Sequence, residues 1–512
     1  QPHPVLHQLN GIQYCVNSPP PWLEGVVLGF QHYLLAVGSV VMITSFVVSQ
    51  MGGDNHDKVQ VMNTFLFVSG INTLLHTFFG TQLPSVIGPS YAFIIPAASI
   101  IESRKYRAVN PPELRFAELM REIQGALIIA SCFQIIFGLL GFWRNIVRLL
   151  SPLTMVPLVC LTGIGLCLII FPTIANCAAV GIPQLLLIIF ISQYLPIFLK
   201  FDQPVCDRYA LLFSVAVISI YSEVLSVSRA IENGSNCPGT STGLIKAAPW
   251  FYIPFPFQWG PPNFSGRSVF SAIAASLVAS VESTGSFIAA ARFGKATPIP
   301  PSVISRGTIW LGFATFLNAI FGSVTGSTAL VENTGLLALT KTGSRRVVQF
   351  ASIFMILLSV FGKMGAVFAS IPSPIMAASY CIFLAYVSSA GLGFLQFSNL
   401  NSFRTKFILG ISFLIGLALP RKCNDRNGSF HPAWVSKTLS DTWNVLITSH
   451  ATVAATVAVI LDSTLRKDGE GMAACRENGS YWWEKFMVYD RDARNEEFFG
   501  LPCGLDKCFP SV

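Results

Sequence analysis

Apolar segments long enough to cross a lipid bilayer recur along almost the whole chain, and they constrain its fold more than any other feature. In windows of about 19 residues, seven segments lie near 25–48, 61–79, 84–101, 123–141, 146–171, 182–199 and 209–228. Seven more lie near 269–291, 308–324, 328–340, 347–369, 372–391, 403–420 and 444–462. Only 11% of the 512 residues are charged and 52% are hydrophobic, whereas a soluble domain has roughly 25% charged residues. The sequence therefore predicts an all-α polytopic membrane protein with 14 transmembrane segments.

The count of seven segments on each side of a polar stretch predicts an internal repeat. A unit with an odd number of spans inserts upside down when it is repeated, as in many secondary transporters. We therefore predict a 7+7 inverted repeat with repeats at 25–228 and 269–462, joined by a polar extracellular loop at 229–268. Residues 1–24 are predicted as an N-terminal cytoplasmic segment and residues 463–512 as a cytoplasmic tail.

Two spans in matching positions, the third of each repeat, are predicted to be short and broken. The third span reads PSVIGPSYAFIIPAAS and contains Pro84, Gly88, Pro89 and Pro96. The tenth begins GSVTGSTALVENTG and leaves about 14 helical residues, fewer than the roughly 20 that a crossing helix needs. Interrupted spans at corresponding places indicate a transporter's midplane binding site, where helix N-termini offer free N–H groups. The alternative is a pair of kinked packing helices.

Acidic side chains inside the predicted spans point to the same region. Glu282 lies within AIAASLVASVESTGSFIAAA, and Glu332 opens the short tenth helix. A charge at the bilayer centre costs at least about 2.5 kcal/mol, so such residues often mark transport pathways. The alternative for Glu282 is an acid that holds helices together through hydroxyl groups or through His32. Gln31 and His32 in the first span are candidates for coupling, although His32 could equally be a packing residue.

Several other classes of protein are disfavoured by the composition. The net charge of +8 is dispersed through loops and the tail, which fits membrane-flanking loops rather than nucleic-acid binding. The twelve cysteines form no CxxC or Cys/His cluster, so neither a metal site nor a disulfide framework is expected. No nucleophile–base set, metal motif or phosphate-binding loop is present, so we expect neither an enzyme nor a bound cofactor.

The motif ENTGLLALTK at 332–341 resembles, at every fixed position, the signature of the nucleobase–ascorbate transporter family. Four further segments are similar to blocks of that family: GFQHY at 29–33, PSYAF at 89–93, VESTG at 281–285 and GSRRVVQ at 343–349. The stretches TPIPPSVISRG at 297–307 and LNSFRTKFILG at 400–410, with the ending FPSV, look most like the plant branch. The chain is thus identified as a plant-type member of the family by resemblance.

The resemblance implies a core domain of spans 1–4 and 8–11 that moves against a gate domain of spans 5–7 and 12–14. The gate domain would also form the contact of a homodimer. Substrate would lie between the two domains, bound by the acid of span 8, the first two signature residues of span 10 and the break in span 3. Carried onto this sequence, the substrate-binding residues are Glu282, Glu332, Asn333, Ser90 and Tyr91.

The chemistry of these residue types suits a nucleobase. A carboxylate can accept two adjacent N–H bonds of a planar base, and an Asn side chain both donates and accepts. The ring of Tyr91 or Phe93 can cover the face of the base. At the other end of the tenth helix, Thr340 and Lys341 are candidates for gating or specificity. The alternative for Lys341 is a cation that interacts with the helix dipole.

Two positions bear on the coupling ion and the substrate. One helical turn after Glu282, where some relatives have His or Asp, this chain has Ser286, so proton coupling depends on Glu282 with His32 as the second candidate. Glu332 stands where vertebrate ascorbate carriers have Pro, which favours a nucleobase over ascorbate. We predict a secondary active transporter of purines or uracil, driven by proton symport through an elevator-type movement. Alternatives are a sodium-coupled or ascorbate transporter, a non-transporting sensor, and a channel or anion exchanger of the same fold.

The orientation in the membrane is predicted from basic residues. The tail after residue 463 is basic, which favours a cytoplasmic C-terminus and, with an even number of spans, a cytoplasmic N-terminus in the plasma membrane. The basic loop after span 3 opposes this orientation. The glycosylation sequons at Asn233, Asn263 and Asn427 are then predicted to be external, and the one at Asn478 internal.

Overall fold

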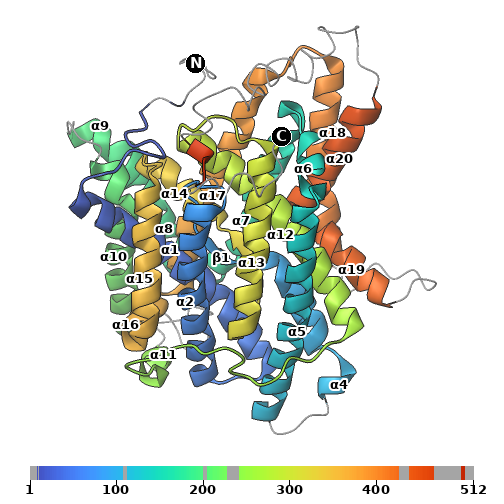
Figure 1. Ribbon diagram of the computed structural model, residues 1–512. Coiled ribbons are helices and arrows are strands. Elements are labelled where there is room, and N and C mark those ends of the chain that lie inside the picture. Colours follow the sequence, from blue (N-terminus) through green and yellow to red (C-terminus); the bar gives the residue numbers. More distant parts are fainter. Residues whose placement is uncertain are drawn as a thin grey trace.

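The structure is a computed structural model of a largely helical protein (Figure 1). It describes the chain except residues 1–8, 10, 108–111, 200–204, 228–241, 426–436, 466–497 and 502–512. The helices of 15 or more residues are α1 (Trp22–Met51), α2 (Asn55–Phe79), α5 (Pro112–Leu139), α7 (Pro152–Asn176), α10 (Val205–Val227), α12 (Gly266–Phe293), α13 (Pro301–Phe321), α15 (Arg345–Val360), α17 (Ser373–Leu392), α18 (Phe403–Asp425) and α20 (His450–Thr464). The shorter ones are α3 (Ile94–Ile101), α4 (Arg104–Arg107), α6 (Phe142–Arg148), α8 (Ala178–Ile189), α9 (Leu195–Leu199), α11 (Thr242–Ala247), α14 (Val331–Thr340), α16 (Gly362–Ala369) and α19 (Lys437–Thr448).

The prediction of a polytopic helical membrane protein is confirmed. Within the part of the chain that the structure describes, nine helical segments are long and apolar enough to cross a membrane, or eleven if each of two bent pairs forms one span. The helix α2 covers the predicted second span but is not among them. It carries several buried polar side chains, including Asn63, Asn72 and His76. The count of 14 spans remains a prediction.

Both spans predicted to be short and broken consist of an extended segment followed by a short helix. In the first repeat, β1 (Ile87–Pro89) leads through the 3-10 turn η2 (Tyr91–Phe93) into α3. In the second, β2 (Ser327–Ala329) leads into α14. The strands pair antiparallel, with Gly88 opposite Thr328. The sequence did not predict these strands, which give the broken backbone the hydrogen-bond partners that lipid cannot supply.

Two other predicted spans are each divided into two helices by a bend. The span near 347–369 divides into α15 and α16, and the helix direction bends by 111° between them. The span near 444–462 divides into α19 and α20 at 84°, where Ser449 caps α20 by accepting a hydrogen bond from the Thr452 N–H. An Asp, Asn or Ser side chain at such a position favours a new helix start over a continuous helix.

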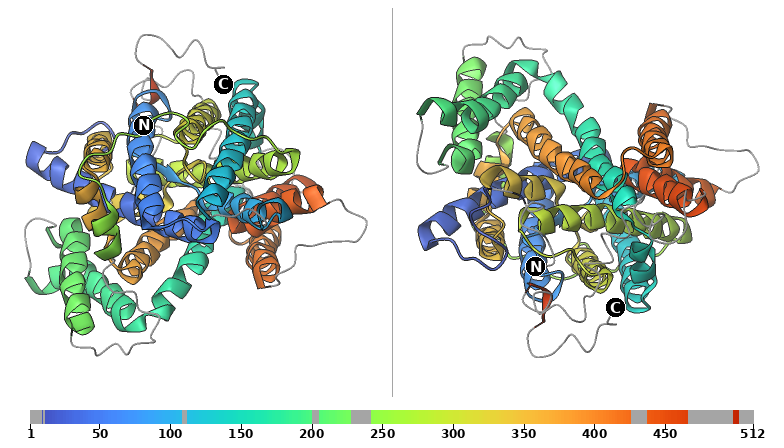
Figure 2. Two further views of the ribbon diagram at one scale, coloured as in Figure 1. Left: turned by 90° about the horizontal axis from the view of Figure 1, so that it is seen from below. Right: turned by 90° about the horizontal axis from the view of Figure 1, so that it is seen from above.

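Close helix packing positions the broken segments. The helix α14 packs against α17, and α12 packs against α7 and α19. A Cβ atom added at Gly335 of α14 would lie 2.1 Å from the Phe383 carbonyl oxygen of α17, so only glycine fits there. Gly285 of α12 approaches Thr162 of α7 in the same way, at 2.7 Å from its Oγ1. In the views along the helices, α8, α9 and α10 lie together at one side of the molecule (Figure 2).

The described residues near the two chain ends lie on the same face. Gly343 donates its N–H to the Tyr14 carbonyl at 2.8 Å, which joins the N-terminal segment to the turn after α14. On the C-terminal side, Gln82 donates to the Gly500 carbonyl at 2.7 Å. The short helices α4 and α11 lie at the opposite end of the long helices (Figure 1). The helix α11 lies within the predicted polar loop at 229–268, and α12 begins at Gly266, before the predicted end of that loop.

Two smaller points concern the predicted loop sites and the cysteines. Asn263 is exposed, whereas Asn233, Asn427 and Asn478 lie outside the described residues. Cys177 is disulfide-bonded, which the scattered cysteines did not predict.

Large apolar side chains are exposed along α8, α9 and α10, among them Leu186, Phe198, Phe213 and Ile220. Such surfaces suit contact with lipid or with another apolar protein face.

Candidate functional site

Glu332, the first predicted binding acid of α14, is buried between three helices. Its side chain is 1% exposed and accepts a hydrogen bond from the Ser39 hydroxyl of α1. The Tyr380 hydroxyl of α17 lies 3.4 Å from the Ser39 oxygen and donates to the Leu35 carbonyl at 2.6 Å. A Cβ atom on Gly38 would collide with the same tyrosine. Glu332 therefore connects α14 to α1 and, through Ser39, to α17.

Asn333 and the Gln31–His32 pair form a second set of contacts. The Asn333 amide nitrogen donates to the His32 carbonyl at 2.9 Å and lies 3.2 Å from His32 Nδ1. Gln31 donates to the Arg208 carbonyl of α10 at 2.8 Å. The Asn333 Oδ1 atom is buried and accepts no hydrogen bond within the described residues. The pair on α1 thus contacts both α14 and α10.

The break in the third span brings Ser90 and Tyr91 to the same place. Ser90 donates its N–H to the Gly326 carbonyl at 3.1 Å, directly beyond the β1–β2 pair. The hydroxyl groups of both residues are buried and have no hydrogen-bond partner in the described part of the chain. Three of the five predicted binding residues, Ser90, Tyr91 and Asn333, therefore present a buried polar atom without a partner.

Glu282, the other predicted binding acid, lies on α12 and is partly exposed. Its carboxylate accepts a hydrogen bond of 3.0 Å from the Ser449 hydroxyl, at the bend between α19 and α20. Among the described residues, no hydrogen bond joins Glu282 to His32, whose Nδ1 atom lies 3.2 Å from the Asn333 amide nitrogen. Glu282 therefore connects α12 to the last bent pair of helices through a hydroxyl group.

Hydroxyl pairs join α12 to the second broken segment. Ser286, the position without a titratable group, lies 2.8 Å from the Thr334 hydroxyl of α14. Ser283 lies 2.8 Å from the Thr328 hydroxyl and accepts the N–H of Ala329, both in β2. These contacts align α12 with β2 and α14. They place Glu282, one turn before Ser286, on the helix that contacts the signature motif.

The gating candidates at the far end of α14 differ in their contacts. Thr340 donates to the Leu336 carbonyl of its own helix at 2.8 Å. Lys341 ends the helix with a left-handed backbone, φ 53°, and pairs with Asp207 of α10 at 2.5 Å. The next residue, Arg208, pairs with Glu24 of α1. Lys341 therefore forms an ion pair between helices, in addition to placing a cation at the C-terminal end of the α14 dipole.

The partners of the predicted residues were not found from the sequence. Ser39, Ser449 and Asp207 contact Glu332, Glu282 and Lys341, and Tyr380 contacts Ser39. Their residue types alone give no signal, because serine and tyrosine are frequent in buried helices. These partners could have been predicted only if the packing of the helices against one another had been known.

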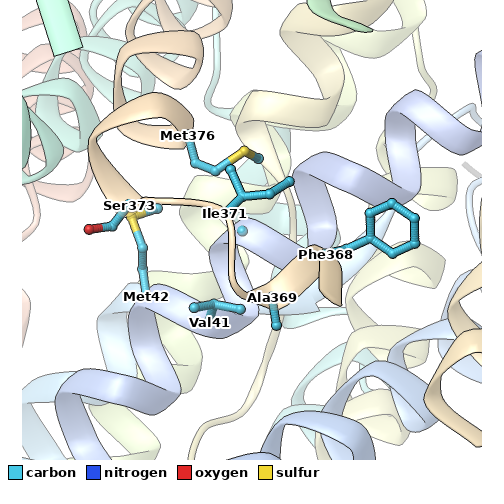
Figure 3. Close-up of a pocket in the computed structure, with 8 residues that line it drawn as sticks. Val41, Met42, Phe368, Ala369, Ile371, Ser373 and Met376 are labelled. Carbon is cyan, nitrogen blue, oxygen red and sulfur yellow. The ribbon is translucent and has the colours of Figure 1, made fainter. Parts of the chain in front are cut away.

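The contact of α1 with α16 and α17 leaves little free space. Val41 and Met42 of α1 face Phe368 of α16 and Met376 of α17 around a recess of about 10 Å³ (Figure 3). A cavity needs at least roughly that volume to hold one water molecule. Within the described residues, no group of three or more His, Cys, Asp or Glu side chains could hold a metal ion.

The arrangement of broken helices, buried acids and apolar spans defines a membrane transport protein. A family profile described as "Permease family" matches residues 23–423. "Putative nucleobase-ascorbate transporter 10" of Arabidopsis thaliana is 52% identical, over 100% of this chain and 96% of the relative. "Nucleobase-ascorbate transporter 4" of the same plant is 51% identical over 100% and 98%. The chain belongs to this permease family, as a plant-type member of the nucleobase–ascorbate transporters. It is therefore a transporter and not an enzyme.

Two solved structures align with most of the chain at low sequence identity. The transmembrane domain of a cyanobacterial bicarbonate transporter aligns over 87% of this chain and 100% of its own, with 14% identity and a TM-score of 0.42. The murine solute carrier 26 family member A9 anion transporter aligns over 87% and 69%, with 11% identity and a TM-score of 0.48.

The buried contact between Ser39 and Glu332 is testable through stability. Ser39→Ala leaves a buried carboxyl group without its hydroxyl donor, which costs about 1–3 kcal/mol. We expect a lower free energy of unfolding in detergent micelles, and a smaller loss when the same change is made in Glu332→Gln. The control is Ser49→Ala, at the exposed end of α1, with an effect within about 0.5 kcal/mol. Equal effects of Ser39→Ala and Ser49→Ala would contradict the described contact.

Proposed function

We propose that the protein is a secondary active transporter of nucleobases, namely purines such as xanthine, uric acid, adenine or guanine, or uracil. The proposal rests on one observation: Asn333 Oδ1, the Ser90 hydroxyl and the Tyr91 hydroxyl are buried without partners among the described residues, on the two segments that the β1–β2 pair brings together. A buried polar atom without a partner costs about 1–3 kcal/mol. A nucleobase edge carries donors and acceptors side by side and can supply these bonds.

In the proposed complex, each residue has a distinct role. The Glu282 carboxylate accepts N–H bonds of the base, and Asn333 Oδ1 accepts another. The hydroxyl groups of Ser90 and Tyr91 donate to carbonyl oxygens of the base. An analogue that lacks these groups leaves the buried partners unpaired, which is the physical basis of selectivity.

Proton symport is assigned to Glu282. Its only hydrogen bond in the described structure is with Ser449, and it is more exposed than Glu332. A carboxyl group at such a place can bind a proton together with the substrate and release both on the other side. His32 is the second coupling candidate, and its ring is held by Asn333. Ser286 supports α14 through Thr334 and takes no part in proton exchange.

An elevator-type movement is supported by the polar contacts between two sets of helices. Spans 1–4 and 8–11, the proposed core domain, include α1, α12 and α14; spans 5–7 and 12–14, the proposed gate domain, include α7, α10, α17 and α20. The contacts Lys341–Asp207, Arg208–Glu24 and Ser449–Glu282 join the two sets and can break as the core moves. The matching order of strand and helix in both broken spans supports the 14-span inverted repeat.

The proposed homodimer uses the gate domain. The helices α8, α9 and α10 expose large apolar side chains, and less than half of each of these spans is buried within one chain. The parts of these apolar faces outside the proposed dimer contact are proposed to contact the lipid bilayer. We assign no nucleic acid, metal or cofactor to the protein.

Uptake into proteoliposomes tests the function. Purified wild-type protein is expected to take up labelled xanthine or uracil when a proton gradient is directed inward, but not labelled ascorbate. Glu282→Gln removes a charged acceptor and the proton site, so uptake is expected to fall by at least about tenfold. Glu113→Gln, an exposed acid at the start of α5, is the matched control and keeps wild-type uptake.

Three results would argue against this function. Absence of uptake for every nucleobase would reject nucleobase transport. A sodium gradient that drives uptake in place of the proton gradient would reject proton symport. Wild-type uptake by Glu282→Gln would reject the central role of that residue.

Both termini are proposed to be cytoplasmic in the plasma membrane. The described residues near the chain ends share one face of the molecule. Asn263 is exposed in the segment between α11 and α12, and α11 lies at the opposite end of the long helices (Figure 1). In a eukaryotic host, Asn263→Gln is expected to remove an N-linked glycan seen as a mobility shift, whereas Asn478→Gln changes nothing. A glycan at Asn478 would reverse the orientation.

A further inference from the structure

A recess of about 260 Å³ lies on the face where the described residues near both chain ends meet, outside the proposed substrate site. Its lining includes Asn17 of the N-terminal segment, Thr77 and Phe78 of α2, and Arg345 and Arg346 of α15. This volume is far above the roughly 10–15 Å³ that one water molecule requires. The recess can therefore hold a group as large as a hydrated phosphate.

The two adjacent arginines have no acidic partner in the part of the chain that the structure describes. Arg345 donates to the Gln82 side-chain oxygen at 3.2 Å and to Asn17, both of which are neutral. Arg346 is exposed, and no ion pair joins either guanidinium group to a carboxylate among the described residues. Two positive charges thus face one recess without an internal counter-charge. Arginine binds phosphate oxygens through paired N–H groups more readily than other side chains do.

The start of α15 adds to this positive field. The helix is 16 residues long, and its N-cap residue, Ser344, makes no side-chain capping bond. The Ser344 hydroxyl is fully buried and has no hydrogen-bond partner among the described residues. The first N–H group of the helix, that of Arg345, already donates to the Val16 carbonyl at 3.0 Å. The helix dipole still favours an anion at this end.

Aromatic residues beside the recess place it at the level of lipid head groups. Trp22, at the start of α1, is 75% exposed, and its ring contacts Phe350 of α15 edge-on at 5.5 Å. Leu23 is 80% exposed, and Phe78 in the recess wall is 48% exposed. Tryptophan is enriched at membrane–water interfaces, where apolar rings contact lipid and polar groups contact water.

From these observations we propose that the recess formed by Arg345, Arg346, Gln82 and Asn17 is a binding site for a terminal phosphate group. The group can come from an anionic lipid head group in the adjacent leaflet or from soluble phosphate. Its binding would connect the N-terminal segment, the end of α2 and the start of α15. The proposal does not depend on nucleobase transport, and binding is measured separately from uptake.

The test uses the purified full-length chain in phosphatidylcholine nanodiscs with and without phosphatidic acid. Native mass spectrometry measures the phosphatidic acid that stays bound, and a separate titration with inorganic phosphate measures thermal stabilisation. We expect saturable binding in at least one arm, and the arm that responds identifies the source of the phosphate. Arg346→Gln is expected to lower the affinity for the phosphate ligand about fivefold. Arg346→Lys is expected to retain part of the affinity because it keeps the positive charge.

The control is Arg148→Gln, which removes one exposed arginine from α6 and changes the net charge equally. It is expected to bind like the wild type. Absence of saturable binding in both arms would overturn the proposal. An equal loss in Arg148→Gln and Arg346→Gln would also overturn it, since that result indicates general charge attraction rather than a site. Wild-type affinity in Arg346→Gln would overturn it as well.

Discussion

The short β1–β2 pair is the interaction on which the rest of the site depends. Two segments that are too short to cross a bilayer as helices leave backbone groups without partners, and lipid cannot supply them. The pair solves this problem by placing Ile87 opposite Ala329 and Pro89 opposite Ser327. Each strand leads directly into the residues of interest, Ser90 and Tyr91 after β1, Glu332 and Asn333 after β2. The predicted binding residues of two distant segments are therefore close because their backbones are paired.

Around this pair, single polar side chains hold the remaining helices in place. Ser283 and Ser286 fix α12 to β2 and α14, and Ser39 fixes α1 to Glu332. Contacts of this size are weak singly, at about 1 kcal/mol each. Lys341 and Glu282 instead make contacts to α10 and to the α19–α20 bend.

The sequence was sufficient to predict a helical membrane protein and its two broken spans, whereas the assignment of the site residues remains a prediction. Hydropathy located the spans because the bilayer demands long apolar runs, and Pro84, Gly88 and Pro89 marked the first break because they cannot sustain a helix. The partners of Glu332 and Glu282 could not be predicted. Ser39 and Ser449 are ordinary hydroxyl residues, and only the packing of α1, α12 and α20 gives them a role.

Equilibrium binding of a labelled nucleobase to the purified protein is the most direct test of the site. The account predicts saturable binding of xanthine or uracil by the wild type and by Asn145→Ala, which alters an exposed asparagine on α6. It predicts that binding is lost in Asn333→Ala, because the buried acceptor Oδ1 is removed. Wild-type affinity in Asn333→Ala, or no binding of any nucleobase by the wild type, would contradict the account.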